Sequence, residues 1–126
     1  MRPDERVLDS DPSSFANRRR GHVEVVAPIH GQILPHDVPI TLLNVSHGGF
    51  LMQSPVAYAV GDMHKFRFTI PGEPNVMVLR GRVAHLTPAT TNGMAAYAIG
   101  VQFMDQQVKD CQEAIQRLVD AASRRQ

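Results

Sequence analysis

The sequence predicts a mainly β fold, a six-stranded antiparallel β-barrel with a C-terminal α-helix. Two patterns predict it. Over most of the chain, apolar residues alternate with polar ones or form short runs between turn residues, but near the C-terminus they recur at spacings of three and four. The length of 126 residues and the hydrophobic fraction of 43% suit a single domain with one core.

The extended segments begin near residue 22. The first, residues 22–34, is rich in Val and Ile and contains Pro28 and Gly31, which indicates a bent or bulged strand. Residues 64–70 alternate apolar and polar positions, as in a half-buried strand. A slip is expected near Gly81, and a loop over residues 87–93. The other predicted strands cover residues 40–45, 50–52, 76–86 and 95–104.

The helix is expected over about residues 105–123, with Asp105 as its N-cap. Its apolar stripe consists of Val108, Cys111, Ile115, Leu118 and Ala122. At the other end of the chain, residues 1–16 mix charge, Ser and Pro with little apolar periodicity. We therefore expect a flexible arm over residues 1–16 and one domain over residues 17–126.

Composition argues against several classes of function. The 13 Lys and Arg nearly balance the 12 Asp and Glu, so the net charge of +1 gives no reason to expect binding to a nucleic acid polymer. No apolar run is long enough for membrane insertion, and the acidic N-terminus is unlike an export signal. The single cysteine, Cys111, forms no internal disulfide and suits a reducing compartment. A cytoplasmic protein is expected.

Two short segments could hold a ligand. Arg18, Arg19 and Arg20 precede the first strand, and guanidinium groups form forked hydrogen bonds with phosphate and stack on purine rings. Residues 44–49, Asn-Val-Ser-His-Gly-Gly, follow the second strand. The alternatives are a solvated basic linker for the arginines and a plain turn, with glycine supplying positive φ, for residues 44–49.

In this order around the first two strands, the two segments resemble the PilZ family. Its signature is RxxxR ahead of the first strand and [D/N]xSxxG after the second. Asn44, Ser46 and Gly49 match the second element, whereas an alignment on Arg18 puts His22 at the place of the second arginine. The resemblance extends from about residue 17 to the end, including the run Ile-Gly-Val-Gln-Phe at residues 99–103 and the closing helix.

The resemblance implies a cytoplasmic receptor or adaptor for cyclic di-GMP (c-di-GMP). In PilZ domains that bind this messenger, arginines hold phosphate and guanine while the turn presents polar groups to a guanine edge. The receptor would signal through ligand-induced ordering of the arginine segment and contact with an unidentified effector protein, in motility or biofilm regulation. The implied ligand-binding residues are Arg18, Arg19, Arg20, His22, Asn44, Ser46, Gly48 and Gly49.

His22 keeps a second interpretation open, because an imidazole carries only part of a positive charge at neutral pH. The alternative is a degenerate PilZ domain that does not bind c-di-GMP and acts as a protein–protein interaction module. An enzyme is not expected, because no nucleophile, base and orienting group can be assembled. The six histidines show no paired ligand spacing, so neither a metal nor another cofactor is predicted.

Two further features have structural interpretations. Cys111 lies on the apolar stripe of the predicted helix, which favours a core thiol over a nucleophile. Lys65, Arg67, Arg80 and Arg82 fall on neighbouring predicted strands. They form either a basic binding face or, as we prefer, an ordinary solvated sheet face.

Overall fold

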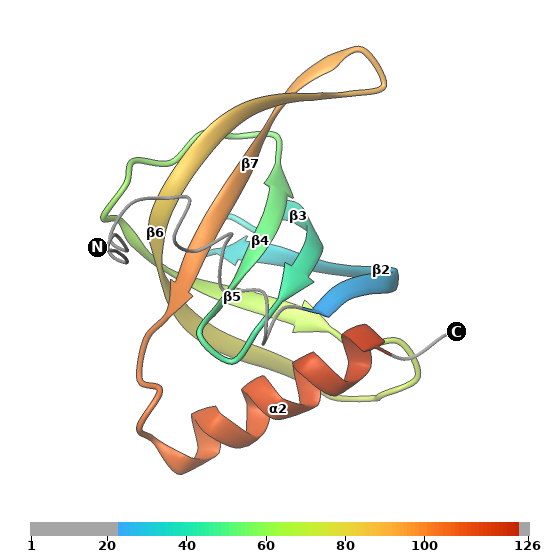
Figure 1. Cartoon of the computed structure of the whole chain (residues 1–126), viewed down its shortest axis with the longest axis vertical. Coiled ribbons are helices and arrows are strands. Elements are labelled where there is room, and N and C mark those ends of the chain that lie inside the picture. Colours follow the sequence, from blue (N-terminus) through green and yellow to red (C-terminus); the bar gives the residue numbers. More distant parts are fainter. Residues whose placement is uncertain (1–22, 124–126) are drawn as a thin grey trace, which may run out of the picture.

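The computed structural model describes residues 23–123 and shows a closed barrel with one helix (Figure 1). The order around the barrel is β2-β3-β4-β7-β6-β5, and every neighbouring pair is antiparallel. This confirms the predicted fold class. The elements are β2 (Val23–Leu34), β3 (Val38–Val45), β4 (Gly49–Ser54), β5 (Met63–Thr69), β6 (Val76–Thr91), β7 (Met94–Phe103) and α2 (Lys109–Ser123).

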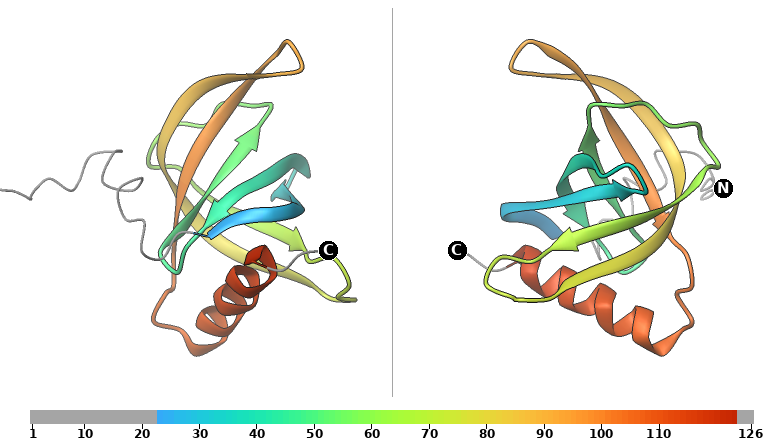
Figure 2. Two further views of the ribbon diagram at one scale, coloured as in Figure 1. Left: turned by 45° about the vertical axis from the view of Figure 1, so that its right-hand side comes forward. Right: turned by 180° about the vertical axis from the view of Figure 1, so that it is seen from behind.

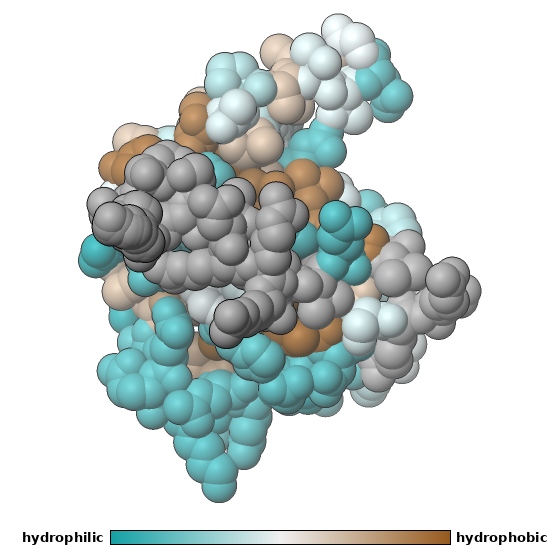
Figure 3. Space-filling view, in the orientation of Figure 1, coloured by the Kyte–Doolittle hydropathy of each residue, from teal (hydrophilic) through white to brown (hydrophobic). Residues whose placement is uncertain are grey.

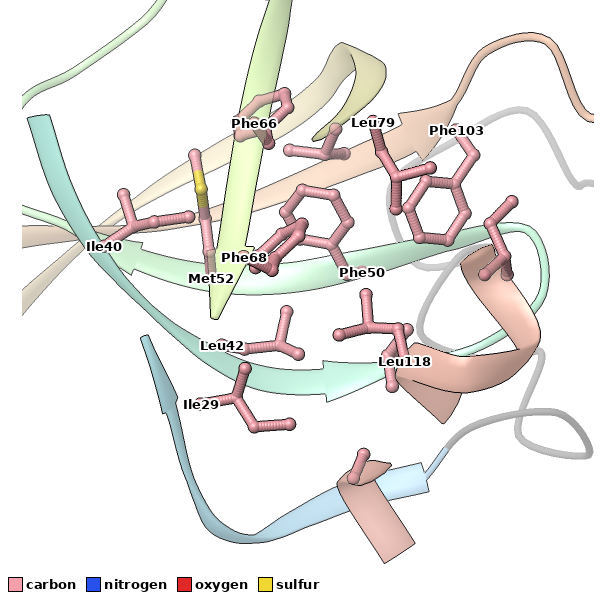
Figure 4. Close-up of a cluster of buried hydrophobic side chains, with 14 of the residues drawn as sticks. Ile29, Ile40, Leu42, Phe50, Met52, Phe66, Phe68, Leu79, Phe103 and Leu118 are labelled. Atoms are coloured by element: carbon pink, nitrogen blue, oxygen red, sulfur yellow. The ribbon is translucent and has the colours of Figure 1, made fainter. Parts of the chain in front are cut away.

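The core fills the inside of the barrel because alternate residues of each strand point inward. Phe50 lies at its centre and is fully buried. Its ring centroid lies 5.2 Å from that of Phe66, 5.3 Å from Phe68 and 5.4 Å from Phe103, and the first two contacts are edge-to-face. Figure 4 shows these rings together with Leu118, which α2 contributes to the same cluster.

The helix α2 lies across one end of the barrel, and the β6–β7 hairpin projects from the other end in all three views (Figures 1 and 2). The buried residues of α2 are Ile115, Leu118, Val119, Ala121 and Ala122. The predicted stripe is therefore wrong at Val108, which is 47% exposed. In the described part of the chain, no helix is long and apolar enough to span a membrane.

The predicted start of the helix at Asp105 is also wrong. The helix begins at Lys109, and Asp105 has a φ of 60°. Its carboxylate accepts two hydrogen bonds from Arg80, at 2.8 Å from Nε and 3.1 Å from Nη2. A side chain held in this forked ion pair is not available to cap the helix, whose first turn is closed by the Gln112 amide donating to the Val108 carbonyl at 2.9 Å.

The β6–β7 hairpin differs from the prediction in its loop. The loop expected over residues 87–93 is strand, because the two strands pair up to Thr91 and Met94 and only Asn92 and Gly93 form the turn. Both turn residues have positive φ, the conformation that an Asn-Gly pair adopts in tight hairpins. The predicted bulge in β2 is confirmed between residues 24 and 29.

The shift in strand register that was expected near Gly81 lies further along β6. The register with β7 shifts between Val83 and His85, whereas Gly81 itself pairs regularly with Phe103. A Cβ at Gly81 would collide with the side chain of Val101. Glycine is therefore required there for close packing of the strands.

The four basic residues of β5 and β6 lie on the outer side of the barrel. Lys65 pairs with Arg80 across the ladder, so their side chains share that side. Arg67 forms an ion pair of 3.0 Å with Asp37, and Arg80 forms the pair with Asp105. Acidic residues thus compensate two of the four charges, in agreement with a solvated sheet face.

Replacing the central ring tests this description of the core. The substitution Phe50→Ala should lower the free energy of unfolding by about 3–5 kcal/mol, because it leaves a cavity that three neighbouring rings cannot fill. Urea denaturation followed by circular dichroism measures the change. Val78→Ala is the matched control: Val78 is half exposed and should cost less than about 1 kcal/mol. Equal losses in the two variants would contradict the assigned core.

Candidate ligand-binding site

The turn between β3 and β4 is closed by Ser46. Its amide donates to the Gly49 carbonyl at 2.8 Å, and the Gly48 amide donates to the Ser46 hydroxyl at 3.2 Å. The hydroxyl itself lies 3.4 Å from the Gly49 carbonyl oxygen, to which it donates. Ser46 therefore has a structural role in the turn, of the kind that serine hydroxyls perform in many short loops.

The turn does not use glycine for positive φ, which corrects the expectation from the sequence. Among the described residues, the glycines with positive φ are Gly61, Gly72 and Gly93, and neither Gly48 nor Gly49 is one of them. Among residues 23–123, and apart from its two chain neighbours, a Cβ built at Gly48 would have only the Ser46 hydroxyl, at 4.0 Å, within that range. The backbone at Gly48 is thus open to close approach from outside, and the turn itself would accept alanine.

Hydrogen bonds attach this turn to two other elements. The Phe103 amide of β7 donates to the Gly48 carbonyl at 2.9 Å. His47 Nε2 lies 2.7 Å from Gln116 Oε1 of α2, and Gln116 Nε2 donates to Asp120 Oδ1 at 2.9 Å. The turn is therefore coupled both to the barrel wall and to the exposed side of the helix.

Asn44 lies just before the turn, near the end of β3. Its Oδ1 atom is buried and accepts no hydrogen bond from residues 23–123. A buried acceptor without a partner costs about 1–3 kcal/mol, which makes such groups rare in folded proteins. A hydrogen-bond donor of a ligand could satisfy this amide oxygen once the groups that cover it move aside.

The strand register places Asn44 in a row of residues across the outside of the barrel. Asn44 pairs with Leu51 of β4, Leu51 with Gly100 of β7, and Gly100 with His85 of β6. A Cβ at Gly100 would collide with the His85 imidazole, so glycine makes room for that ring. Burial lowers the pKa of His85, which disfavours a positive charge on the imidazole.

This row was not predicted, because it depends on which strands pair and in what register. Leu51, Gly100 and His85 are far apart in the sequence, and no local pattern marks them as neighbours of Asn44. Because burial disfavours its charged form, His85 is a poor source of positive charge for the row. An anionic ligand would need cations from another segment.

The arginine segment lies outside the described residues, as do His22 and the predicted arm over residues 1–16. Asn44, Ser46, Gly48 and Gly49 lie together at the end of the barrel next to α2. The first described residue, Val23, pairs with Val45. The chain therefore enters β2 directly beside Asn44 and the turn.

Residues 23–123 show neither a metal site nor a reactive thiol. Residues 23–123 contain no group of three or more His, Cys, Asp or Glu side chains placed to hold a metal ion. Cys111 is half-buried, and its Sγ donates to the Met104 carbonyl at 3.5 Å. Burial, and secondarily the charge of Asp105, raise the pKa of this thiol, which disfavours the nucleophilic thiolate.

Comparisons with known proteins agree with the motif in the sequence. The family profile for the PilZ domain matches residues 16–121. No curated protein matches the chain closely enough to count as a relative.

Solved structures show the same fold at low sequence identity. The PilZ domain of YcgR from Escherichia coli with c-di-GMP has a TM-score of 0.64 at 13% identity, covering 83% of this chain and 91% of that one. A structure of E. coli YcgR in complex with c-di-GMP has a TM-score of 0.62 at 15% identity. The match covers 82% of this chain and 45% of that one. The Bacillus subtilis inhibitor of motility, MotI/DgrA, has a TM-score of 0.61 at 15% identity. The match covers 82% of this chain and 50% of that one. This chain thus spans about half the length of the latter two.

Substitutions of Asn44 and Ser46 should differ in their effect on stability. Asn44→Ala removes a buried acceptor that has no partner among the described residues, so the free energy of unfolding should stay constant or rise by about 1 kcal/mol. Ser46→Ala removes the acceptor for the Gly48 amide and should lower it by about 1 kcal/mol. Urea denaturation of the ligand-free protein compares the two. A larger loss for Asn44→Ala would show that the Asn44 amide supports the fold.

Proposed function

Because the chain belongs to the PilZ domain family, we propose that it is a receptor for c-di-GMP that acts through contact with an effector protein. One observation carries the proposal. The Asn44 amide oxygen, which has no hydrogen-bond partner among residues 23–123, and the Gly48 backbone, which is open toward those residues, lie beside the point where the chain enters β2 after the arginine segment. A polar turn and a cluster of cations thus lie within reach of one ligand.

The chemistry of the nucleotide suits these groups. The edge of guanine carries N–H donors, which suit an acceptor such as Asn44 Oδ1, and an open backbone at Gly48 lets a flat base approach closely. The negative phosphates of the nucleotide are stabilised by positively charged side chains. Arginine binds phosphate through two parallel hydrogen bonds. Arg20 is three residues before Val23, so covalent geometry keeps their Cα atoms within roughly 11 Å of each other.

A signalling route follows from the same contacts. In the proposed complex the arginine segment closes over the nucleotide against the turn, and the free energy of fixing that segment is subtracted from the affinity. The turn is bonded to α2 through His47 and Gln116. An effector protein in the cytoplasm would read the changed surface at this end of the barrel. The structural similarity to the B. subtilis inhibitor of motility favours motility control as the regulated process.

Calorimetric titration with c-di-GMP tests the receptor proposal. The unmodified chain should bind, and Arg18→Ala should weaken binding roughly tenfold or more, because a hydrogen bond to a charged group is lost. Gly48→Ala should weaken binding without lowering stability, because its methyl group blocks only the approach from outside. Asn75→Ala, at an exposed turn between β5 and β6, is the control and should bind normally. No heat at high ligand concentration would favour the interaction module instead.

The substitution His22→Arg tests the alignment of the first motif. A guanidinium is fully charged at neutral pH, whereas an imidazole is only partly charged. If His22 occupies the place of the second family arginine, the variant should bind c-di-GMP roughly tenfold more tightly at neutral pH. Titrations of both proteins at the same ionic strength measure the difference. An unchanged affinity would mean that His22 does not contact the ligand.

A further inference from the structure

The β6–β7 hairpin extends beyond its neighbours in the barrel. β4 pairs with β7 only as far as Tyr97, and β5 pairs with β6 only as far as Arg82. Residues 89–96, here called the hairpin tip, therefore pair only with each other among the described residues. Figures 1 and 2 show the hairpin tip at the end of the molecule opposite α2. Such a ribbon presents unpaired backbone groups along its edge.

The end of β4 explains why the edge of β7 is open. Pro55 follows Ser54 and has no amide hydrogen to donate to another strand. The Ser54 hydroxyl donates to the Val56 carbonyl at 2.8 Å and accepts from the Val56 amide at 3.1 Å, which stabilises the turn that ends β4. Within the described part of the chain, residues 94–96 of β7 consequently pair with no strand on the side away from β6.

A cleft of about 540 Å³ lies between the hairpin tip, β2, the start of β3 and the end of β4. None of the residues that line this cleft is Asp, Glu, Lys or Arg. Its walls include the polar residues His30, Gln32 and Gln53 as well as Ile40, Met94 and Ala96. A lining without acidic residues, lysine or arginine favours an uncharged occupant over an ionic one.

The hairpin tip shares this lack of charge. Between Arg82 and Asp105 the chain contains no Asp, Glu, Lys or Arg, although these types make up 20% of the whole. Met94 is 72% exposed. In Figure 3 most of the hairpin tip is pale, with hydrophobic colour beneath it, whereas hydrophilic colour gathers over α2. Natural proteins usually protect an open strand edge with charged side chains, and the edge at residues 94–96 has none.

We infer that this edge is an interface between two copies of the chain. The β7 edges pair in antiparallel fashion about a two-fold axis at Ala95, which places Ala95 opposite its counterpart and Met94 opposite Ala96 of the second copy. Each Met94 then covers apolar surface at the other copy's cleft. A second copy fits because the edge, the exposed methionine and the uncharged cleft occur side by side on one molecule, as a self-complementary interface requires.

Sedimentation equilibrium of the full chain, without nucleotide, tests the interface. The apparent mass should rise from 13.9 kDa toward twice that value between low micromolar and near-millimolar concentration, because a short ladder gives a weak dimer. A mass that stays at 13.9 kDa over this range would overturn the inference. It would also leave the edge available to a different protein.

Charge substitutions locate the interface. Ala95 is exposed, so Ala95→Lys should fold normally but weaken the dimer roughly tenfold or more, because two ammonium groups would face each other at the axis. Mixing Ala95→Lys with Ala95→Glu should restore association. Gln112→Lys adds the same charge on the exposed side of α2 and should leave the dimer unchanged. Association that Ala95→Lys does not weaken, or that the mixture does not restore, would overturn the assigned axis.

Discussion

The burial of Phe50 is the constraint on which the rest of the structure depends. Its ring is enclosed by those of Phe66, Phe68 and Phe103, so it joins strands from three parts of the barrel. Phe50 also directly follows Gly49, the last residue of the polar motif. Fixing this ring therefore fixes the backbone of the adjacent turn, and the candidate site is preorganised by the core beneath it.

Near the outer surface of the barrel, the fold contains two polar features that stability alone would not favour. Asn44 has a buried oxygen with no partner among residues 23–123, and Gly48 lacks a side chain that its turn would accept. Both features cost stability or add none, and both suit a ligand that supplies donors and needs close approach. The same fold occurs in structures at 13–15% sequence identity. This is consistent with a core in which the total apolar volume matters more than the identity of each residue.

The barrel separates its two candidate surfaces. The turn lies next to α2, whereas the hairpin tip projects from the opposite end. Charged residues are also distributed unequally between these two ends. The hairpin tip has none, whereas α2 is rich in them. Nucleotide binding and self-association would thus use different ends of the molecule, and substitutions at one end should leave the other unchanged.

The sequence by itself determined most of the residues that face the core, although the stripe failed at Val108 and the loop expected over residues 87–93 is strand. Alternation at Phe66 and Phe68 and the period of three and four in α2 are local properties, and the tight turn at Asn92 was present in the sequence as an Asn-Gly pair. Only the tertiary structure decided that β4 pairs with β7 and that β5 closes the barrel on β2. The tertiary structure also pairs the Asp105 carboxylate with Arg80. It places Asn44 and His85 in one row of residues across four strands. The physical reason is that side-chain periodicity shows which face of a strand is buried, whereas the choice of partner strand depends on hydrogen bonds between distant segments.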